Sequence, residues 1–279
     1  MADKRYSVLI SVYTRENPDY FKLSIESMVN QTLGPEEIVI VKDGPLTEEL
    51  DKIVDYYVSN YSELFTIVTL TKNVGLGKAL NEGLRVCRNE LVARMDTDDI
   101  SLLYRYELQV NEFIKDKDLD IIGSNIDEFY ENSNEIVSSR IVPIEHEEIM
   151  KFSKRRNPFN HPTVMYKKSS VLRNSGYSDF RRNQDLDLFV RMLNNGCNAR
   201  NINQSLLLFR ANNENLKRRK SWKKCKSYIS MIYSFWRNGY SSLIDLTIVA
   251  ASQIIIFVSP SWVLESITSK YLRKTYKSR

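Results

Sequence analysis

Apolar and polar residues alternate in blocks along the first part of the chain, in a pattern that predicts strands separated by single helices. Short apolar runs predict strands at Tyr6–Tyr13, Glu37–Lys42, Phe65–Leu70 and Leu91–Met95. The stretches between them carry apolar residues at helical spacing, at Tyr20–Asn30, Thr47–Asn60 and Gly77–Arg88. Strands that alternate with helices form a parallel sheet covered on both faces, so the sequence predicts an α/β fold.

The second half of the chain gives weaker signals. It predicts strands at Asp120–Asn125, Ile126–Tyr130 and Ser138–Pro143, a loop that enters a strand at Asn157–Tyr166, and a helix at Asp185–Asn194. No internal repeat or low-complexity tract is visible. The 279 residues suffice for one large domain with an appendage.

Three carboxylates crowd the end of the fourth predicted strand, at Asp96, Asp98 and Asp99. Carboxylates this close repel one another, so a fold tolerates them best where a divalent cation or N–H donors neutralise them. Oxygen ligands in this position suit Mg²⁺ or Mn²⁺, which also bridge to phosphates. Taken alone, the cluster is as readily an acidic turn with Asp99 as the N-cap of the next helix.

Two more polar turns follow predicted strands, at Asp43-Gly44-Pro45 and Asn73-Val74-Gly75. Ligands of parallel α/β sheets bind at the carboxyl ends of the strands, so we expect both turns on the same rim as the acidic cluster. Each also has an ordinary interpretation, because Asp-Gly is a common turn and Gly75 can supply backbone freedom.

The charge is unevenly distributed. The net charge of +5 combines +11 over residues 217–279 with −6 over the rest. Basic residues crowd Lys217–Lys226 and Ser259–Arg279, whereas Leu243–Val258 is mostly apolar. Basic, aromatic-bearing segments fit interfacial membrane helices, and the uninterrupted apolar run Ile254–Val258 is far shorter than the ~20 residues of a spanning helix. A solvated helical hairpin packed on the body is the alternative.

Cysteine usage and the N-terminus predict a cytoplasmic protein. Cys87, Cys197 and Cys225 are odd in number, widely spaced and in no metal-binding pattern, which is typical of reduced thiols. The N-terminal MADKRYSVLISVY lacks the long apolar core and cleavage site of a signal peptide.

Six segments, in this order, resemble one known family. They read SVLISVYTRENPDYFKLSIESMVNQT, VIVKDG, NVGLGKALNEG, RMDTDD, NPFNHPTVMYKKS with SGY, and QDLDLFVRML. Over roughly residues 5–210 the chain is similar to the family 2 glycosyltransferases of the GT-A fold, in the style of bacterial O-antigen, capsule and exopolysaccharide enzymes.

The resemblance implies a Rossmann-like, mostly parallel central sheet with helices on both faces. Residues 1–215 would form the GT-A domain, with a nucleotide-sugar-binding half at about 1–100 and an acceptor-binding half at about 101–215. Residues 216–279 would form a basic, partly apolar helical tail that associates with a membrane.

The resemblance also implies which residues bind the donor. The nucleotide sugar would lie on Ser11, Val12, Tyr13, Asp43, Asn73, Gly75, Lys78, Asp96 and Thr97. Among these, Asp43 would contact the base or ribose. Asp98 would ligate Mn²⁺ or Mg²⁺, with Asp96 beside it.

Asp185 falls where the family places its general base. An inverting transfer needs a carboxylate for the acceptor's proton and a cation for the departing diphosphate. Asp187 competes, but residues two apart on a helix point in different directions, so only one faces the site. The family's usual Glu-Asp pair is Gln184-Asp185 here. Acceptor contacts are implied for His161, Asp99 and Gln184, although a lone His161 is also readily structural, or less readily a metal ligand.

Two departures from the family pattern change the expectation. Many relatives place a metal-binding His after a segment like Leu208-Phe209-Arg210, whereas this chain reads Ala211-Asn212-Asn213. We therefore expect a metal site built from carboxylate, pyrophosphate and water. The Gln-x-x-Arg-Trp motif of processive synthases is also missing, so the enzyme should add one sugar and stop.

Other classes of protein fit less well. A sugar nucleotidyltransferase would show a glycine- and lysine-rich phosphate loop, which Ser11–Pro18 lacks. A nucleic-acid-binding module could use Lys217–Lys226 with Trp222, but Leu243–Val258 is too apolar for that role, so we expect no nucleic acid. An inactive scaffold in a membrane complex would not need the intact acidic residues.

The sequence thus predicts a metal-dependent, inverting, non-processive transferase that takes a hexose from UDP-glucose or UDP-galactose. Its acceptor would be a lipid-linked undecaprenyl pyrophosphate oligosaccharide in O-antigen or capsule biosynthesis, joined in a β linkage. Residues 217–279 would meet the anionic surface of the bacterial inner membrane, on its cytoplasmic face.

Overall fold

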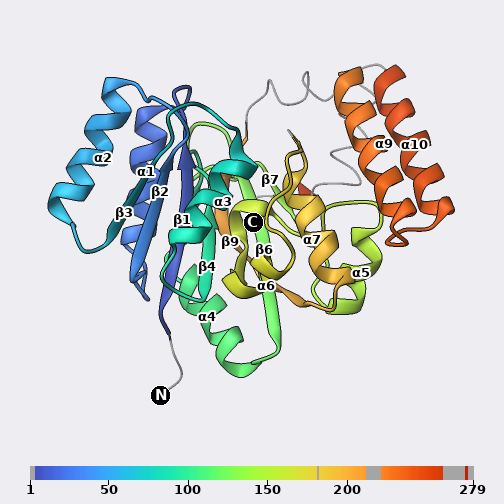
Figure 1. Ribbon diagram of the computed structural model, residues 1–279, viewed down its shortest axis with the longest axis horizontal. Coiled ribbons are helices and arrows are strands. Elements are labelled where there is room, and N and C mark those ends of the chain that lie inside the picture. The colour runs from blue at the N-terminus through green and yellow to red at the C-terminus, as the bar shows by residue number, and fades with distance from the viewer. Residues whose placement is uncertain (1–3, 181, 212–220, 260–273, 276–279) are drawn as a thin grey trace.

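One twisted sheet organises the molecule, with helices on both of its faces (Figure 1). The computed structural model describes residues 4–180, 182–211, 221–259 and 274–275. Within these ranges the helices are α1 (Pro18–Val29), α2 (Glu48–Asn60), α3 (Leu76–Val86), α4 (Arg105–Lys115), α5 (His146–Ser153), α6 (Lys168–Arg173), α7 (Gln184–Asn194), α9 (Trp222–Arg237) and α10 (Leu243–Val258). Along the sheet the strands lie in the order β10 (Lys274–Thr275), β7 (Ser138–Arg140), β6 (Leu119–Phe129), β8 (Met165–Lys167), β4 (Leu91–Met95), β1 (Tyr6–Val12), β2 (Glu37–Lys42) and β3 (Phe65–Thr69).

The four predicted N-terminal strands form the parallel part of the sheet. They are β1 (Tyr6–Val12), β2 (Glu37–Lys42), β3 (Phe65–Thr69) and β4 (Leu91–Met95). Strand β1 lies between β2 and β4, and β3 pairs with β2 at the edge, all in parallel. The predicted α/β fold is therefore confirmed.

Alternate side chains of β1 explain why its central residues, Val8, Leu9 and Ile10, are all apolar. Val8 and Ile10 pack in one hydrophobic cluster with Phe21 of α1, whereas Leu9 packs in a second cluster with Leu80 of α3. Because both faces are covered by helices, the strand exposes neither side to water.

Local signals set the helix boundaries in this half. Asn17 caps α1 by accepting hydrogen bonds from the N–H groups of Asp19 and Tyr20, and Pro18 occupies the first helical turn. Thr47 caps α2 in the same way. The predicted helices therefore begin within a few residues of their expected positions.

The second half contains strands that the sequence pattern described less well. They are β5 (Ile100–Ser101), β6 (Leu119–Phe129), β7 (Ser138–Arg140), β8 (Met165–Lys167), β9 (Asn198–Arg210) and β10 (Lys274–Thr275). The two strands predicted at 120–125 and 126–130 are the single strand β6, whose register against β9 shifts around Asn125. Strand β9 was not predicted; it runs parallel to β6 and antiparallel to β5.

Helices α9 and α10 form a hairpin beside α7 (Figure 1). Leu186 and Val190 of α7 pack against Met231, Ile232 and Phe235 of α9. In the described part of the chain, every helix is too short or too polar to cross a bilayer. The tail predictions for residues 217–220, 260–273 and 276–279 lie outside the described residues.

Candidate active site

A cleft of ≈ 320 Å³ opens at the carboxyl edge of β1, β2 and β4. Its walls are Ser11, Tyr13, Glu16, Asp43, Asn73, Gly75, Leu76, Arg94, Asp96, Thr97 and Asp98. Eight of these eleven residues are ones that the sequence assigned to the donor or the metal. The polar turns expected on one rim therefore do meet there.

Asp43 joins two of these turns into one unit. Its Oδ1 accepts a hydrogen bond from Val74 N–H at 2.7 Å, and its Oδ2 accepts one from Gly75 N–H at 3.1 Å. Gly44 has φ +88°, and a Cβ there would lie 2.7 Å from the backbone nitrogen of Asn73. Both the conformation and the close approach therefore require glycine after Asp43.

Arg94 lies behind the acidic cluster and is fully buried. Its guanidinium forms an ion pair with the Asp96 carboxylate and donates to the backbone oxygen of Leu9 at 3.3 Å. The backbone oxygen of Asp96 accepts a hydrogen bond from Ser24 Oγ at 2.8 Å. The side chain and backbone of Asp96 are thus both fixed by the protein itself.

Burial and neighbouring negative charge raise the pKa values of two cleft carboxyls, Glu16 and Asp98. Burial, reinforced by the negative charge of Asp96, raises the pKa of Asp98 to about 6. Burial also raises the pKa of Glu16 to about 7, against the lowering effect of its hydrogen bond with Thr97. The cleft therefore holds more negative charge than its surroundings stabilise.

The donor set in this cleft fits a hard divalent cation. Mg²⁺ and Mn²⁺ are held by one or two carboxylates, with water and substrate phosphates as the other ligands. Asp96 and Asp98 supply such oxygens in this cleft. Among the described residues, no three His, Cys, Asp or Glu side chains converge as a metal site.

Three predicted residues lie close to the cleft without lining it. Val12 is buried in the sheet core, and Asp99 is fully buried with its Oδ1 accepting from Arg210 N–H at 3.0 Å. Burial and the neighbouring Asp98 raise the pKa of Asp99. Lys78 forms an ion pair with Asp179 at 2.8 Å. The assigned roles of these three residues stay predictions.

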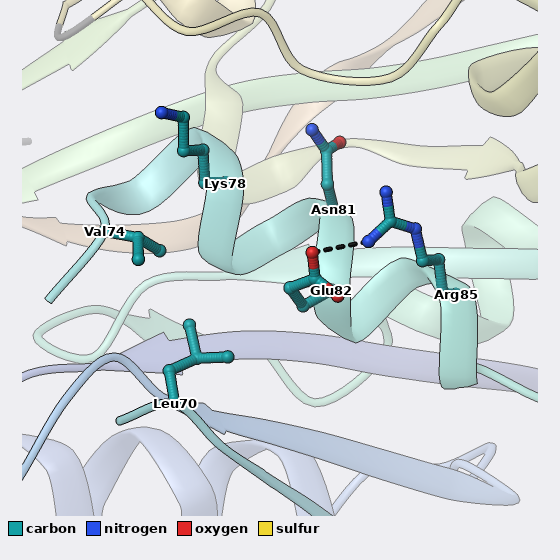
Figure 2. Close-up of a pocket in the computed structure, with 6 residues that line it drawn as sticks. All are labelled: Leu70, Val74, Lys78, Asn81, Glu82 and Arg85. Carbon is teal, nitrogen blue, oxygen red and sulfur yellow. Dashed lines mark hydrogen bonds and ion pairs between the residues drawn. The ribbon is translucent and has the colours of Figure 1, made fainter. Parts of the chain in front are cut away.

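Lys78 belongs to a second hollow, of ≈ 270 Å³, along α3 (Figure 2). The other lining residues are Leu70, Val74, Asn81, Glu82 and Arg85. Figure 2 shows Lys78 projecting from the first turn of α3, away from the Glu82–Arg85 ion pair. Val74, whose N–H donates to Asp43, also lines this hollow.

Asp185 lies in the first turn of α7, where the helix dipole favours a carboxylate. Its Oδ2 accepts a hydrogen bond from Asn157 Nδ2 at 2.6 Å. Asp187, its competitor, instead forms an ion pair with Arg191 at 2.8 Å and is largely buried. Gln184 is buried beside Gly77 of α3. The geometry leaves Asp185 as the more available carboxylate.

His161 connects the two sides of the site electrostatically. Burial and the charge of Arg94 lower its pKa, whereas Asp185 and Asp96 raise it. Its Nε2 lies 3.1 Å from the Tyr177 hydroxyl. These groups from both halves of the domain are thus near enough to influence one imidazole.

Sequence reasoning missed Glu16, Leu76 and Arg94 as walls of the cleft. The sequence could have identified Arg94, because an arginine in the otherwise apolar strand LVARM needs a buried acidic partner. For Glu16 the only indication in the sequence is its position, three residues after Tyr13 in the loop that follows β1.

A mostly parallel sheet with an acidic cleft at its carboxyl edge is the architecture of the GT-A transferases. The model of glycosyl transferase family 2 matches residues 7–179, and the chain belongs to this family. It is accordingly a glycosyltransferase.

Named relatives and a solved structure agree with this assignment. The chain is 35% identical over 270 residues to the UDP-Gal:alpha-D-GlcNAc-diphosphoundecaprenol beta-1,3-galactosyltransferase of Escherichia coli, covering 97% of each chain. It is 36% identical over 226 residues to the amylovoran biosynthesis glycosyltransferase AmsE of Erwinia amylovora, covering 81% of this chain and 84% of that one. The mannosyltransferase PcManGT of Pyrobaculum calidifontis, solved with GDP-Man and Mn²⁺, shares the fold at a TM-score of 0.63 and 14% identity, over 95% of this chain and 73% of that one.

Removing the Asp43 carboxylate should loosen the rim of the cleft. Asp43→Ala leaves the N–H groups of Val74 and Gly75 without their acceptor, so the free energy of unfolding should fall by about 1–3 kcal/mol. Asp43→Asn keeps one oxygen and should lose less. Urea unfolding of the two variants tests this, and equal stability of Asp43→Ala and wild type would contradict it.

The raised pKa of Glu16 should make the protein less stable as pH rises. The native state holds the Glu16 proton up to about pH 7, whereas an unfolded Glu loses it near 4.5, so this contribution is complete below about 4.5 and lost by about 7. Glu16→Gln should therefore gain stability over wild type as pH increases. Melting temperatures in chelator across this range measure the difference, and a difference independent of pH would refute the assignment.

Proposed function

We propose that this enzyme transfers galactose from UDP-galactose to a GlcNAc residue carried on a diphosphoundecaprenol lipid, with a β linkage. The observation that carries the proposal is the acidic cleft facing the Asp185 side of the domain, in a chain similar over nearly its whole length to an enzyme named for that reaction. UDP-glucose is the second candidate donor, because the two sugars differ at one hydroxyl.

The nucleotide of the donor would lie across the cleft. Ser11 and Tyr13 would lie under it, and Asp43 with Asn73 would meet its base and ribose. The Asp43 carboxylate already holds the backbone of Val74 and Gly75, so it would act mainly by shaping this wall. Lys78, with its ion pair to Asp179, would have to turn from that partner to reach the donor.

Asp98 would hold Mn²⁺ or Mg²⁺, with Asp96 beside it. When bound, such a cation offsets the negative charge that develops on the departing diphosphate. Arg94 keeps the Asp96 carboxylate oriented toward the cleft, since it contacts Asp96 from the buried side. Protons compete for the same oxygens, because the pKa of Asp98 is raised to about 6.

Asp185 would take the proton of the acceptor hydroxyl as its oxygen bonds to the anomeric carbon and the bond from that carbon to the diphosphate breaks. Attack from the face opposite the leaving group inverts an α-linked donor, which gives the β product. Asn157 holds one carboxylate oxygen at 2.6 Å, leaving the other for the acceptor. His161 and Gln184 would lie near the acceptor, together with Asp99 behind the cleft.

The acceptor lipid would place the enzyme at the cytoplasmic face of the bacterial inner membrane. Relatives named for exopolysaccharide and O-antigen biosynthesis support this setting. Transfer of one sugar per acceptor agrees with the missing motif of processive synthases. A sugar nucleotidyltransferase or a scaffold fits less well, because the chain belongs to glycosyl transferase family 2.

Donor choice tests the proposed function directly. With Mn²⁺ and a synthetic GlcNAc-diphospholipid, UDP-galactose should give one β-linked galactose per acceptor, identified by NMR of the product. UDP-glucose is the near-isosteric control, and GDP-mannose should give nothing. Transfer from GDP-mannose, or no transfer from any UDP-sugar, would contradict the proposal.

Asp185→Asn should remove the base without removing the donor site. We expect turnover to fall by about 10²–10⁴-fold while UDP with Mn²⁺ still raises the melting temperature. The matched control is Asp187→Asn, which breaks the Arg191 ion pair and should lower stability more than rate. If Asp187→Asn lost the activity and Asp185→Asn kept it, the base would be Asp187.

A further inference from the structure

Helix α10 presents an apolar stripe to solvent. Ile244, Ile248, Ala251, Ile255 and Val258 follow one another at intervals of four and three residues, so they share one face of the helix. All five are exposed, with Ile244 and Val258 each at 68% of their full accessible surface. An apolar face of this length on a water-exposed helix marks an interaction surface.

The opposite face of α10 already has its partner. Leu246 and Val249 pack against α9. Asp245 accepts a hydrogen bond from the N–H of Ser242, the N-cap of α10, and forms an ion pair with Arg155 at 2.5 Å. The hairpin is therefore attached to the body through α9 and Asp245. The stripe points away from this attachment, so among the described residues nothing in the domain covers it.

The rest of the hairpin indicates what covers the stripe. Helix α9 exposes the aromatic side chains of Trp222, Tyr233 and Trp236, together with the charges of Lys223, Lys226 and Arg237. From Ser221 to Ser259 the sequence holds a single acidic residue, Asp245, which is buried and paired. Apolar, aromatic and cationic side chains without exposed acids are complementary to an anionic bilayer surface.

We propose that the α9–α10 hairpin docks on the interface of an anionic membrane, with the α10 stripe toward the acyl chains. Neither helix crosses the bilayer, which agrees with the lengths of the described helices. The exposed aromatic rings would sit at the headgroup level, and Lys223, Lys226 and Arg237 would contact lipid phosphates. This inference rests on the proposed function in one respect, because a lipid-linked acceptor gives the docking its purpose.

Docking through the hairpin would hold the catalytic side of the enzyme at the bilayer. Helix α9 packs on α7, the helix whose first turn carries Asp185. The Tyr228 hydroxyl of α9 also donates to the backbone oxygen of Arg155 at 2.9 Å, and the charge of Asp185 contributes to the raised pKa of Tyr228. A hairpin fixed in the membrane thus places Asp185 within reach of a headgroup sugar.

Flotation of the full chain with vesicles tests the inference without donor or acceptor. Wild type should float with phosphatidylcholine vesicles that contain phosphatidylglycerol, and much less with phosphatidylcholine alone. Ile248→Asp with Ile255→Asp places two charges on the stripe and should weaken binding about tenfold or more. The matched control is Tyr56→Asp, an exposed aromatic on α2 at the far end of the molecule (Figure 1).

The variants also separate this inference from the proposed function. The Ile248→Asp, Ile255→Asp protein should keep wild-type turnover on a short-chain, water-soluble acceptor and lose it on acceptor embedded in vesicles. Unchanged flotation of this variant would overturn the inference, as would a wild type that does not float. A wild-type dimer that the two substitutions dissociate, with no flotation, would also overturn it and assign the stripe to a second copy.

Discussion

The concentration of negative charge around one buried guanidinium is the constraint on which the site depends. Arg94 lowers the pKa values of Glu16, Asp98 and Asp99 and pairs with Asp96, yet burial and mutual repulsion still leave the first three raised. A guanidinium stays protonated, so Arg94 is a fixed charge that compensates only part of the cluster. The rest of the negative charge is neutralised by protons at low pH. In the proposed donor complex, a cation bound to the phosphates of the donor would neutralise it instead.

The same guanidinium links the donor side to the acceptor side. Arg94 lies on β4, which pairs in parallel with β1 and antiparallel with β8, so β4 is the strand where the two halves of the sheet meet. Burial and the charge of Arg94 lower the pKa of His161, whose Nε2 lies 3.1 Å from the Tyr177 hydroxyl. Arg94 thus acts on an imidazole of the second half of the domain as well as on the carboxylates of the first.

Much of the donor half could be predicted because its information is local. A parallel strand buried on both faces needs an unbroken apolar run, and the polar residue that ends it, such as Asp43, falls at the ligand-binding edge. Strand β9 could not be found this way, because NARNINQSLLLFR is polar at its start and gains its conformation from pairing with β6. Side-chain direction was equally out of reach, as Lys78 and Asp99 show, since it depends on partners such as Asp179 that are distant in sequence.

The position of the α9–α10 hairpin on the surface of the domain explains the apolar composition of α10. A helix as apolar as α10 would ordinarily be buried in a core, yet only Asp245 and Val249 are buried there. Among the described residues nothing covers its apolar stripe, which is the reason for proposing a membrane as the partner of this face. A UDP-sugar is water-soluble and a polyprenyl acceptor is not, which means that an enzyme joining them must work at a boundary. With α9 packed on α7, the helix that carries the proposed base is also the helix that holds the hairpin proposed to meet the lipid.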